Sequence, residues 1–136
     1  MSPVLVLDAE AVSILARPRG PRIRRVQAAL EAARRLQREV VTPAVVLAEL
    51  YRGPGQNQVV DACLSRETGL TVRSTDRSFA RYVGSVLATA RADSSDMVDA
   101  HVAAAVEGGG GLVLTGDGDD LTRLAASYPN VHVERL

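Results

Sequence analysis

The stretch Val4-Leu5-Val6-Leu7-Asp8 runs four apolar residues directly into a carboxylate. A continuous run of Val and Leu is typical of a strand that is buried on both faces of a sheet. Residues 9–16 have the pattern of a helix, so Asp8 lies where a strand ends and a helix begins. Ligands bind at that edge of open α/β sheets, but Asp is also a preferred helix N-cap. The stretch predicts an α/β fold and leaves both roles open for Asp8.

Length and composition are those of one globular domain spanning residues 1–136. Hydrophobic residues make up 46% of the chain, with 16 basic residues against 16 acidic ones. All the basic residues are Arg, so a mechanism that needs Lys is excluded. Cys63 is the only cysteine, and its apolar neighbours predict a buried thiol. A single cysteine cannot form a disulfide within the chain, which suits a reducing compartment. We find no signal peptide and no membrane span, and expect a cytoplasmic protein.

Apolar patterns of two kinds alternate along the chain. Helical spacing predicts helices over residues 9–16, 22–38, 44–52, 58–66, 76–91 and 94–107, and one from the turn at 116–120 to about 128. Short apolar runs predict strands at 4–7, 40–41, 70–73, 112–115 and 130–134. Thr42 and Pro43 form a favourable helix start, with Thr as the N-cap. The alternation predicts a mainly parallel sheet with helices on both faces.

Two of the apolar strands are followed by acidic residues, Asp8 after the first and Asp117 after Leu114. Because parallel strands end at the same edge of a sheet, we expect Asp8 and Asp117 to meet. Two further acids, Glu49 and Asp99, lie in predicted helices. The alternative for Glu49 is an ion pair with Arg52, three residues along the helix. The alternative for Asp99 is a role in the first turn, as capping-box partner of Asp96.

Taken together, the four carboxylates predict a metal site. Four carboxylates at one sheet edge repel one another, and a hard divalent cation offsets that repulsion. Oxygen ligands alone suit Mg²⁺ or Mn²⁺. His101 and His132 are far apart in sequence, and we interpret both as structural histidines.

The acidic pattern resembles that of PIN-domain nucleases. The resemblance rests on Asp8, on Glu49 in Ala-Glu-Leu-Tyr-Arg, on Asp99 in Asp-Ala-His-Val-Ala-Ala-Ala, and on Asp117 in Leu-Thr-Gly-Asp. The motifs follow the order of the family and cover nearly the whole chain. Small members of the family are VapC-type toxins of bacterial toxin–antitoxin pairs. The resemblance implies a PIN-like three-layer α/β/α domain with a roughly five-stranded parallel sheet, an endoribonuclease dependent on Mg²⁺ or Mn²⁺, an RNA substrate, a VapB-like antitoxin and a homodimer.

On this hypothesis Asp8, Glu49, Asp99 and Asp117 hold the metal, which activates a water for attack on the phosphodiester. We assign metal binding to Asp99 and helix capping to Asp96, because Asp99 lies a turn further in among apolar residues. Thr115 is expected to orient an acid or a water. Asp96, Asp119 and Asp120 are secondary candidates for the site. Candidates for contact with RNA are Arg17, Arg19, Arg22 and Arg24, and the alternative for each is a solvated position in a loop.

Two other functions fit parts of the pattern. A phosphatase of the haloacid-dehalogenase type would use Asp8 as its nucleophile and the acids at 117–120 as its late motif, but that family typically uses a Lys. A non-catalytic PIN-like binding module would keep the fold without the chemistry. For the dimer, the helices at 44–52 and 58–66 offer apolar side chains, namely Val45, Val46, Leu50, Val59 and Cys63.

Overall fold

A five-stranded, entirely parallel sheet forms the centre of the protein. The computed structural model describes residues 3–106 and 109–136. Along the sheet the strands follow the order β3-β2-β1-β4-β5. Their bounds are β1 Val4–Leu7, β2 Glu39–Pro43, β3 Leu70–Arg73, β4 Gly111–Thr115 and β5 Val131–Arg135. The predicted parallel sheet is confirmed.

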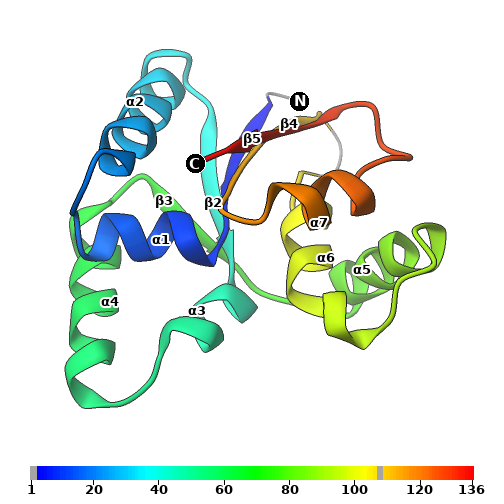
Figure 1. Cartoon of the computed structure of the whole chain (residues 1–136), viewed down its shortest axis with the longest axis horizontal. Coiled ribbons are helices and arrows are strands. Elements are labelled where there is room, and N and C mark those ends of the chain that lie inside the picture. Colours follow the sequence, from blue (N-terminus) through cyan, green and yellow to red (C-terminus); the bar gives the residue numbers. More distant parts are fainter. Residues whose placement is uncertain (1–2, 107–108) are drawn as a thin grey trace.

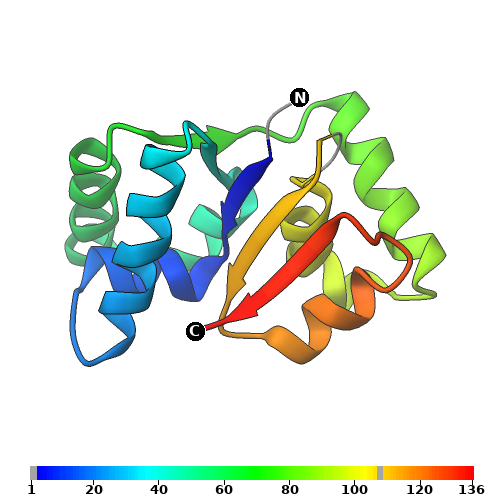
Figure 2. The same cartoon turned by 90° about the horizontal axis from the view of Figure 1, so that it is seen from above.

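Helices separate the strands and form the outer layers (Figures 1 and 2). In both views α1, α2 and α4 lie on one side of the molecule, and α5, α6 and α7 on the other. No helix in the described part of the chain has the length and apolar character needed to cross a membrane. The helices are α1 Ala9–Ala16, α2 Arg22–Arg35, α3 Ala44–Leu50, α4 Pro54–Arg66, α5 Arg77–Thr89, the 3₁₀ turn η1 Ser94–Asp96, α6 Met97–Ala104 and α7 Gly118–Leu124.

The strand order places a switch point between β1 and β4. From β1 the chain moves outward through β2 to β3, then crosses back to β4 and continues to β5. Connections leaving β1 and β4 therefore run in opposite directions. In open α/β sheets the crevice for ligands lies outside the carboxyl ends of the strands at such a point. Asp8 and the loop after Thr115 occupy that position.

The central strands are buried because helices cover both of their faces. Val6, Leu7, Val113 and Leu114 have no exposed surface, in agreement with the continuous apolar runs of β1 and β4. The thiol of Cys63 is also fully buried, as predicted. A rigid, closely packed pair of strands thus supports the loops that carry the acidic residues.

Two element boundaries differ from the prediction for identifiable reasons. Thr42 does not cap α3, because its hydroxyl donates a 2.9 Å hydrogen bond to the carbonyl of Leu7 within the sheet. Strand β2 consequently continues to Pro43, and α3 begins at Ala44. Helix α4 begins at Pro54, earlier than predicted, because proline is favourable in the first turn of a helix.

The start and the end of α6 also differ from the prediction. Asp96 occupies the N-cap position of α6, as predicted, but its side chain makes no capping hydrogen bond to the first turn, contrary to the prediction. Asp93 caps the preceding 3₁₀ turn η1, where its carboxylate accepts from the Ser95 backbone N–H at 2.9 Å. Helix α6 ends at Ala104. The prediction that it reaches residue 107 falls partly outside the described residues.

Gly111 provides a test of the packing between β1 and β4. A Cβ at this position would lie 2.1 Å from the Val4 carbonyl oxygen in the neighbouring strand. We expect Gly111→Ala to lower the free energy of unfolding by about 1–3 kcal/mol, measured by urea denaturation.

Gly84 is the matched control, because a Cβ there meets nothing within 4 Å on helix α5. Gly84→Ala is expected to stabilise the protein by roughly 0.5–1 kcal/mol, since glycine is unfavourable inside a helix. Equal stability of Gly111→Ala and the unmodified protein would contradict the close approach of β1 and β4.

Candidate metal centre

Asp8 both caps a helix and faces the sheet edge, so the two roles left open by the sequence coexist. One carboxylate oxygen, Oδ1, accepts a 2.9 Å hydrogen bond from the Ala11 backbone N–H at the start of α1. The other, Oδ2, accepts from the Thr115 hydroxyl at 2.5 Å and from the Gly116 backbone N–H at 3.1 Å. Asp8 is only 6% exposed. Burial raises its pKa, and the three hydrogen bonds act in the opposite direction.

Thr115 connects the two acids that follow the central strands. Its hydroxyl donates to Asp8 and accepts a 2.7 Å hydrogen bond from the backbone N–H of Asp117. The side chain is fully buried. The expectation that Thr115 orients an acid is therefore confirmed, and the acid is Asp8.

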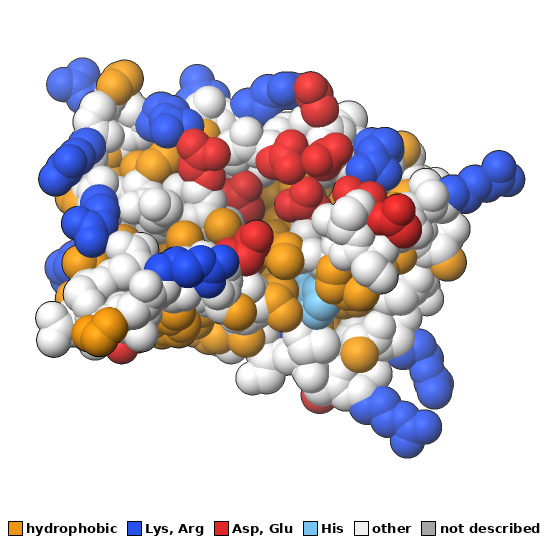
Figure 3. Space-filling model, turned by 60° about the horizontal axis from the view of Figure 1, so that its bottom comes forward, with side chains coloured by type: hydrophobic (Ala, Val, Ile, Leu, Met, Phe, Trp, Pro, Cys, Tyr) orange, Lys and Arg blue, Asp and Glu red, His pale blue; other side chains and the backbone are white. Residues whose placement is uncertain are grey.

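A cavity of about 370 Å³ opens beside these residues, and six of its ten lining residues are acidic. Figure 3 shows acidic side chains gathered around a hollow on this face. The residues predicted to bind metal all line this cavity, although Asp8 and Asp117 come from strand ends and the other two from helices. The acidic lining residues are Asp8, Glu10, Glu49, Asp99, Asp117 and Asp120.

A tighter group of carboxylates lies at the same place. Asp96, Asp99 and Asp120 each offer a carboxylate oxygen, and within the described residues these oxygens lie within 4.8 Å of one another. Asp99 belongs to both this group and the four predicted ligands. The donor set is all oxygen, which suits a hard divalent cation. The structure thus brings the predicted residues together, and their role as ligands stays a prediction.

Asp99 carries the clearest electrostatic sign of crowding. Its pKa is raised from 3.8 to about 7, chiefly by burial. The charge of Asp117 and a hydrogen bond with that residue are the next causes, followed by the charges of Asp120 and Asp8. A protonated Asp99 therefore relieves the repulsion when no cation is present, and metal binding would have to displace that proton.

Two arginines supply positive charge at the edge of the acidic group. Arg22 of α2 forms an ion pair with Glu10. Arg123 of α7 contacts Asp96 at 2.8 Å and Asp120 at 3.4 Å. Of the other arginines proposed for RNA contact, Arg17 donates to Gln56 at 3.1 Å, whereas Arg19 and Arg24 are exposed.

The three secondary candidates for the metal site, Asp96, Asp119 and Asp120, lie at different positions relative to the cavity. Asp120 lines the cavity and Asp96 belongs to the tight carboxylate group. Asp119 is 87% exposed in its side chain and forms an ion pair with Arg135 instead.

Sequence reasoning missed Glu10 and Arg123. A Cβ at Gly116 would lie 1.8 Å from Glu10 Oε2, so this glycine leaves the space that the Glu10 carboxylate fills. The i,i+3 spacing of Asp120 and Arg123 was a usable signal. The contact of Arg123 with Asp96 left no signal in the sequence, because the two residues are 27 positions apart.

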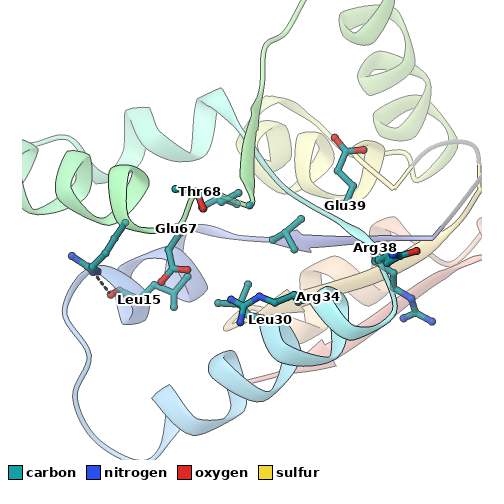
Figure 4. Close-up of a pocket in the computed structure, with 12 residues that line it drawn as sticks. Leu15, Leu30, Arg34, Arg38, Glu39, Glu67 and Thr68 are labelled. Carbon is teal, nitrogen blue, oxygen red and sulfur yellow. Dashed lines mark hydrogen bonds between the residues drawn. The ribbon is translucent and has the colours of Figure 1, made fainter.

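A larger cavity of about 540 Å³ lies at the opposite edge of the sheet (Figure 4). It is lined by the amino ends of β2 and β3, at Glu39 and Leu70, together with residues of α1, α2 and α4. Arg66 in its wall donates to the Leu15 carbonyl at 3.2 Å. Its charged residues are of mixed sign, three arginines and two glutamates, so it lacks the concentration of carboxylates found in the acidic cavity.

The architecture defines a PIN-like three-layer α/β/α fold. Solved structures with this arrangement include VapBC2 from Rickettsia felis bound to promoter DNA (17% identity, TM-score 0.64) and FitAcB from Neisseria gonorrhoeae (18%, 0.61). DNA-bound VapBC from Salmonella typhimurium is a third (15%, 0.62). The matches cover 98%, 96% and 98% of this chain, and the same shares of the matched chains. Neither models of protein families nor curated proteins match the sequence. The likeness confirms the resemblance at the level of the fold.

The raised pKa of Asp99 predicts how the metal-free protein responds to pH. The folded state holds the Asp99 proton more tightly than the unfolded chain, so this stabilisation is complete below pH 3.8 and is lost as the pH rises through about 7. In EDTA, we expect the melting temperature to fall between about pH 5 and about pH 8, and to fall less in Asp99→Asn.

Glu31→Gln is the control for this measurement, since Glu31 is an exposed carboxylate on α2 that pairs with Arg34. That variant should show the pH response of the unmodified protein. An Asp99→Asn variant with the full pH response would contradict the assignment of the titrating group.

Proposed function

We propose that the protein is an endoribonuclease, dependent on Mg²⁺ or Mn²⁺, that acts as the toxin of a VapBC-type toxin–antitoxin pair. The observation that carries the proposal is the convergence of six carboxylates on one cavity at the switch point of a PIN-like sheet. Arg22 and Arg123 offset the charges of Glu10 and Asp120, and a bound cation would offset the repulsion among the remaining carboxylates.

In the proposed mechanism, Asp8, Glu49, Asp99 and Asp117 hold the metal directly or through water. When bound, the metal lowers the pKa of a water and offsets charge on the scissile phosphodiester. Asp8 is fixed for this task by its hydrogen bonds to Ala11, Thr115 and Gly116. The carboxylate of Asp99 must be ionised to bind the metal, so we expect binding to strengthen as the pH rises through about 7.

RNA must approach an acidic cavity, and cations at its edge support that approach. Arg22 and Arg123 are placed there, each already paired with a carboxylate. Metal binding would reduce the local negative charge further and so favour a polyanion.

The partners in the proposal are a VapB-like antitoxin and a second copy of the chain, in the cytoplasm. Structures of VapBC and FitAcB complexes support an antitoxin. The apolar surface for a dimer is smaller than expected, because Val46 and Cys63 are buried within the chain. Val45, Leu50 and Val59 on α3 and α4 are partly buried and remain as dimer candidates. Light scattering, alone and with the product of the neighbouring gene, tests both partners.

RNA cleavage is the direct test of the proposed activity. We expect purified protein to cleave RNA in the presence of Mg²⁺ or Mn²⁺, and we expect cleavage to stop when EDTA is added. Asp99→Asn should lower the rate by about a hundredfold or more, in line with the loss of a metal ligand or of its support. Asp119→Asn is the matched control, because Asp119 is an exposed acid paired with Arg135 outside the cavity.

The same assay separates the alternatives. Cleavage that persists in EDTA would reject the metal-dependent mechanism. Hydrolysis of a simple phosphate monoester without RNA cleavage would favour the haloacid-dehalogenase type of phosphatase. Metal binding without turnover of either substrate would favour a PIN-like binding module.

A further inference from the structure

Arg123 reaches from α7 into the carboxylate group formed by Asp96, Asp99 and Asp120. One guanidinium nitrogen, Nη2, lies 2.8 Å from Asp96 Oδ1 and 3.4 Å from Asp120 Oδ1. The side chain of Asp96 is 15% exposed, whereas those of Arg123 and Asp120 are about half exposed, at 46% and 47%. The contact with Asp96 is therefore both the shorter and the better shielded from water.

This contact changes which acids are available to a cation. A carboxylate oxygen that accepts a charge-assisted hydrogen bond from Arg is satisfied, and a guanidinium stays charged at any physiological pH. Asp96 is thereby satisfied by a resident positive charge. The hydrogen bonds of Arg123 go to Asp96 and Asp120, whereas Asp99 lines the cavity together with Asp8 and Asp117.

We propose that Arg123 is a positioning residue that separates the carboxylates with which it pairs from those that bind the metal. It holds Asp96, and more weakly Asp120, and it leaves Asp8, Glu49, Asp99 and Asp117 as the set that takes the metal. The inference rests on the proposed metal site and adds a regulatory element to it. Arg123 lowers the affinity for a divalent cation and keeps a second ion from binding between Asp96 and Asp120.

Mn²⁺ binding measured by electron paramagnetic resonance, with no RNA present, tests the inference. Arg123→Gln should bind Mn²⁺ about tenfold more tightly, the size expected when one positive charge near a divalent cation is removed. Arg123→Lys keeps the charge and should stay close to the unmodified protein. Arg35→Gln, a change of equal charge at an exposed position on α2, should have no effect.

Asp96 completes a double-mutant cycle with Arg123. Asp96→Asn alone should change the Mn²⁺ affinity by less than about twofold, because Arg123 already occupies that carboxylate. In the Arg123→Gln background the same change should remove most of the gain, because Asp96 is then free to bind metal.

The outcomes distinguish this inference from the proposed function. If the unmodified protein binds Mn²⁺ and Arg123→Gln binds it equally or more weakly, Arg123 does not restrain the site and the inference alone is overturned. If neither protein binds Mn²⁺ while circular dichroism shows both folded, the metal site itself is wrong and both proposals fall.

Discussion

The site depends on the hydrogen bonds of the Asp8 carboxylate, because they join three parts of the chain. The carboxylate accepts hydrogen bonds from the first turn of α1, from the last residue of β4 and from the loop beyond β4. The two central strands of the sheet are thereby locked together at their carboxyl ends. The Asp117 backbone is fixed in turn through Thr115. The Asp8 carboxylate therefore belongs both to a structural hydrogen-bond network and to the candidate metal ligands.

The cost of this arrangement is electrostatic. Burial and neighbouring carboxylates raise the pKa of Asp99 to about 7, so the fold itself does not satisfy that charge. Arg22 and Arg123 offset part of the negative charge, through Glu10 and through Asp96 with Asp120. The remaining acids offer the oxygen ligands that hard divalent cations prefer. The repulsion between these carboxylates in the metal-free protein would therefore favour metal binding.

The sequence alone predicted the sheet, the edge at which the acids meet and the four acids that line one cavity. Those features follow from local patterns, namely apolar runs that end in Asp and acids set in apolar helices. It failed where a side chain is used by a distant partner. Thr42 bonds to the Leu7 carbonyl instead of capping α3, and the Asp96 side chain pairs with Arg123 instead of bonding to the first turn of α6. Such choices depend on tertiary packing, which single-sequence patterns do not encode.

The central claim is that a divalent cation binds at the switch point of the sheet, with Asp99 among its ligands. Anomalous diffraction from a crystal soaked in Mn²⁺ tests this claim most directly. The account predicts a single strong peak in the cavity, within coordination distance of the Asp99 carboxylate and close to Asp8 or Asp117. The claim would be contradicted by a peak bound only by residues outside this cavity, or by no peak at a Mn²⁺ concentration that supports RNA cleavage.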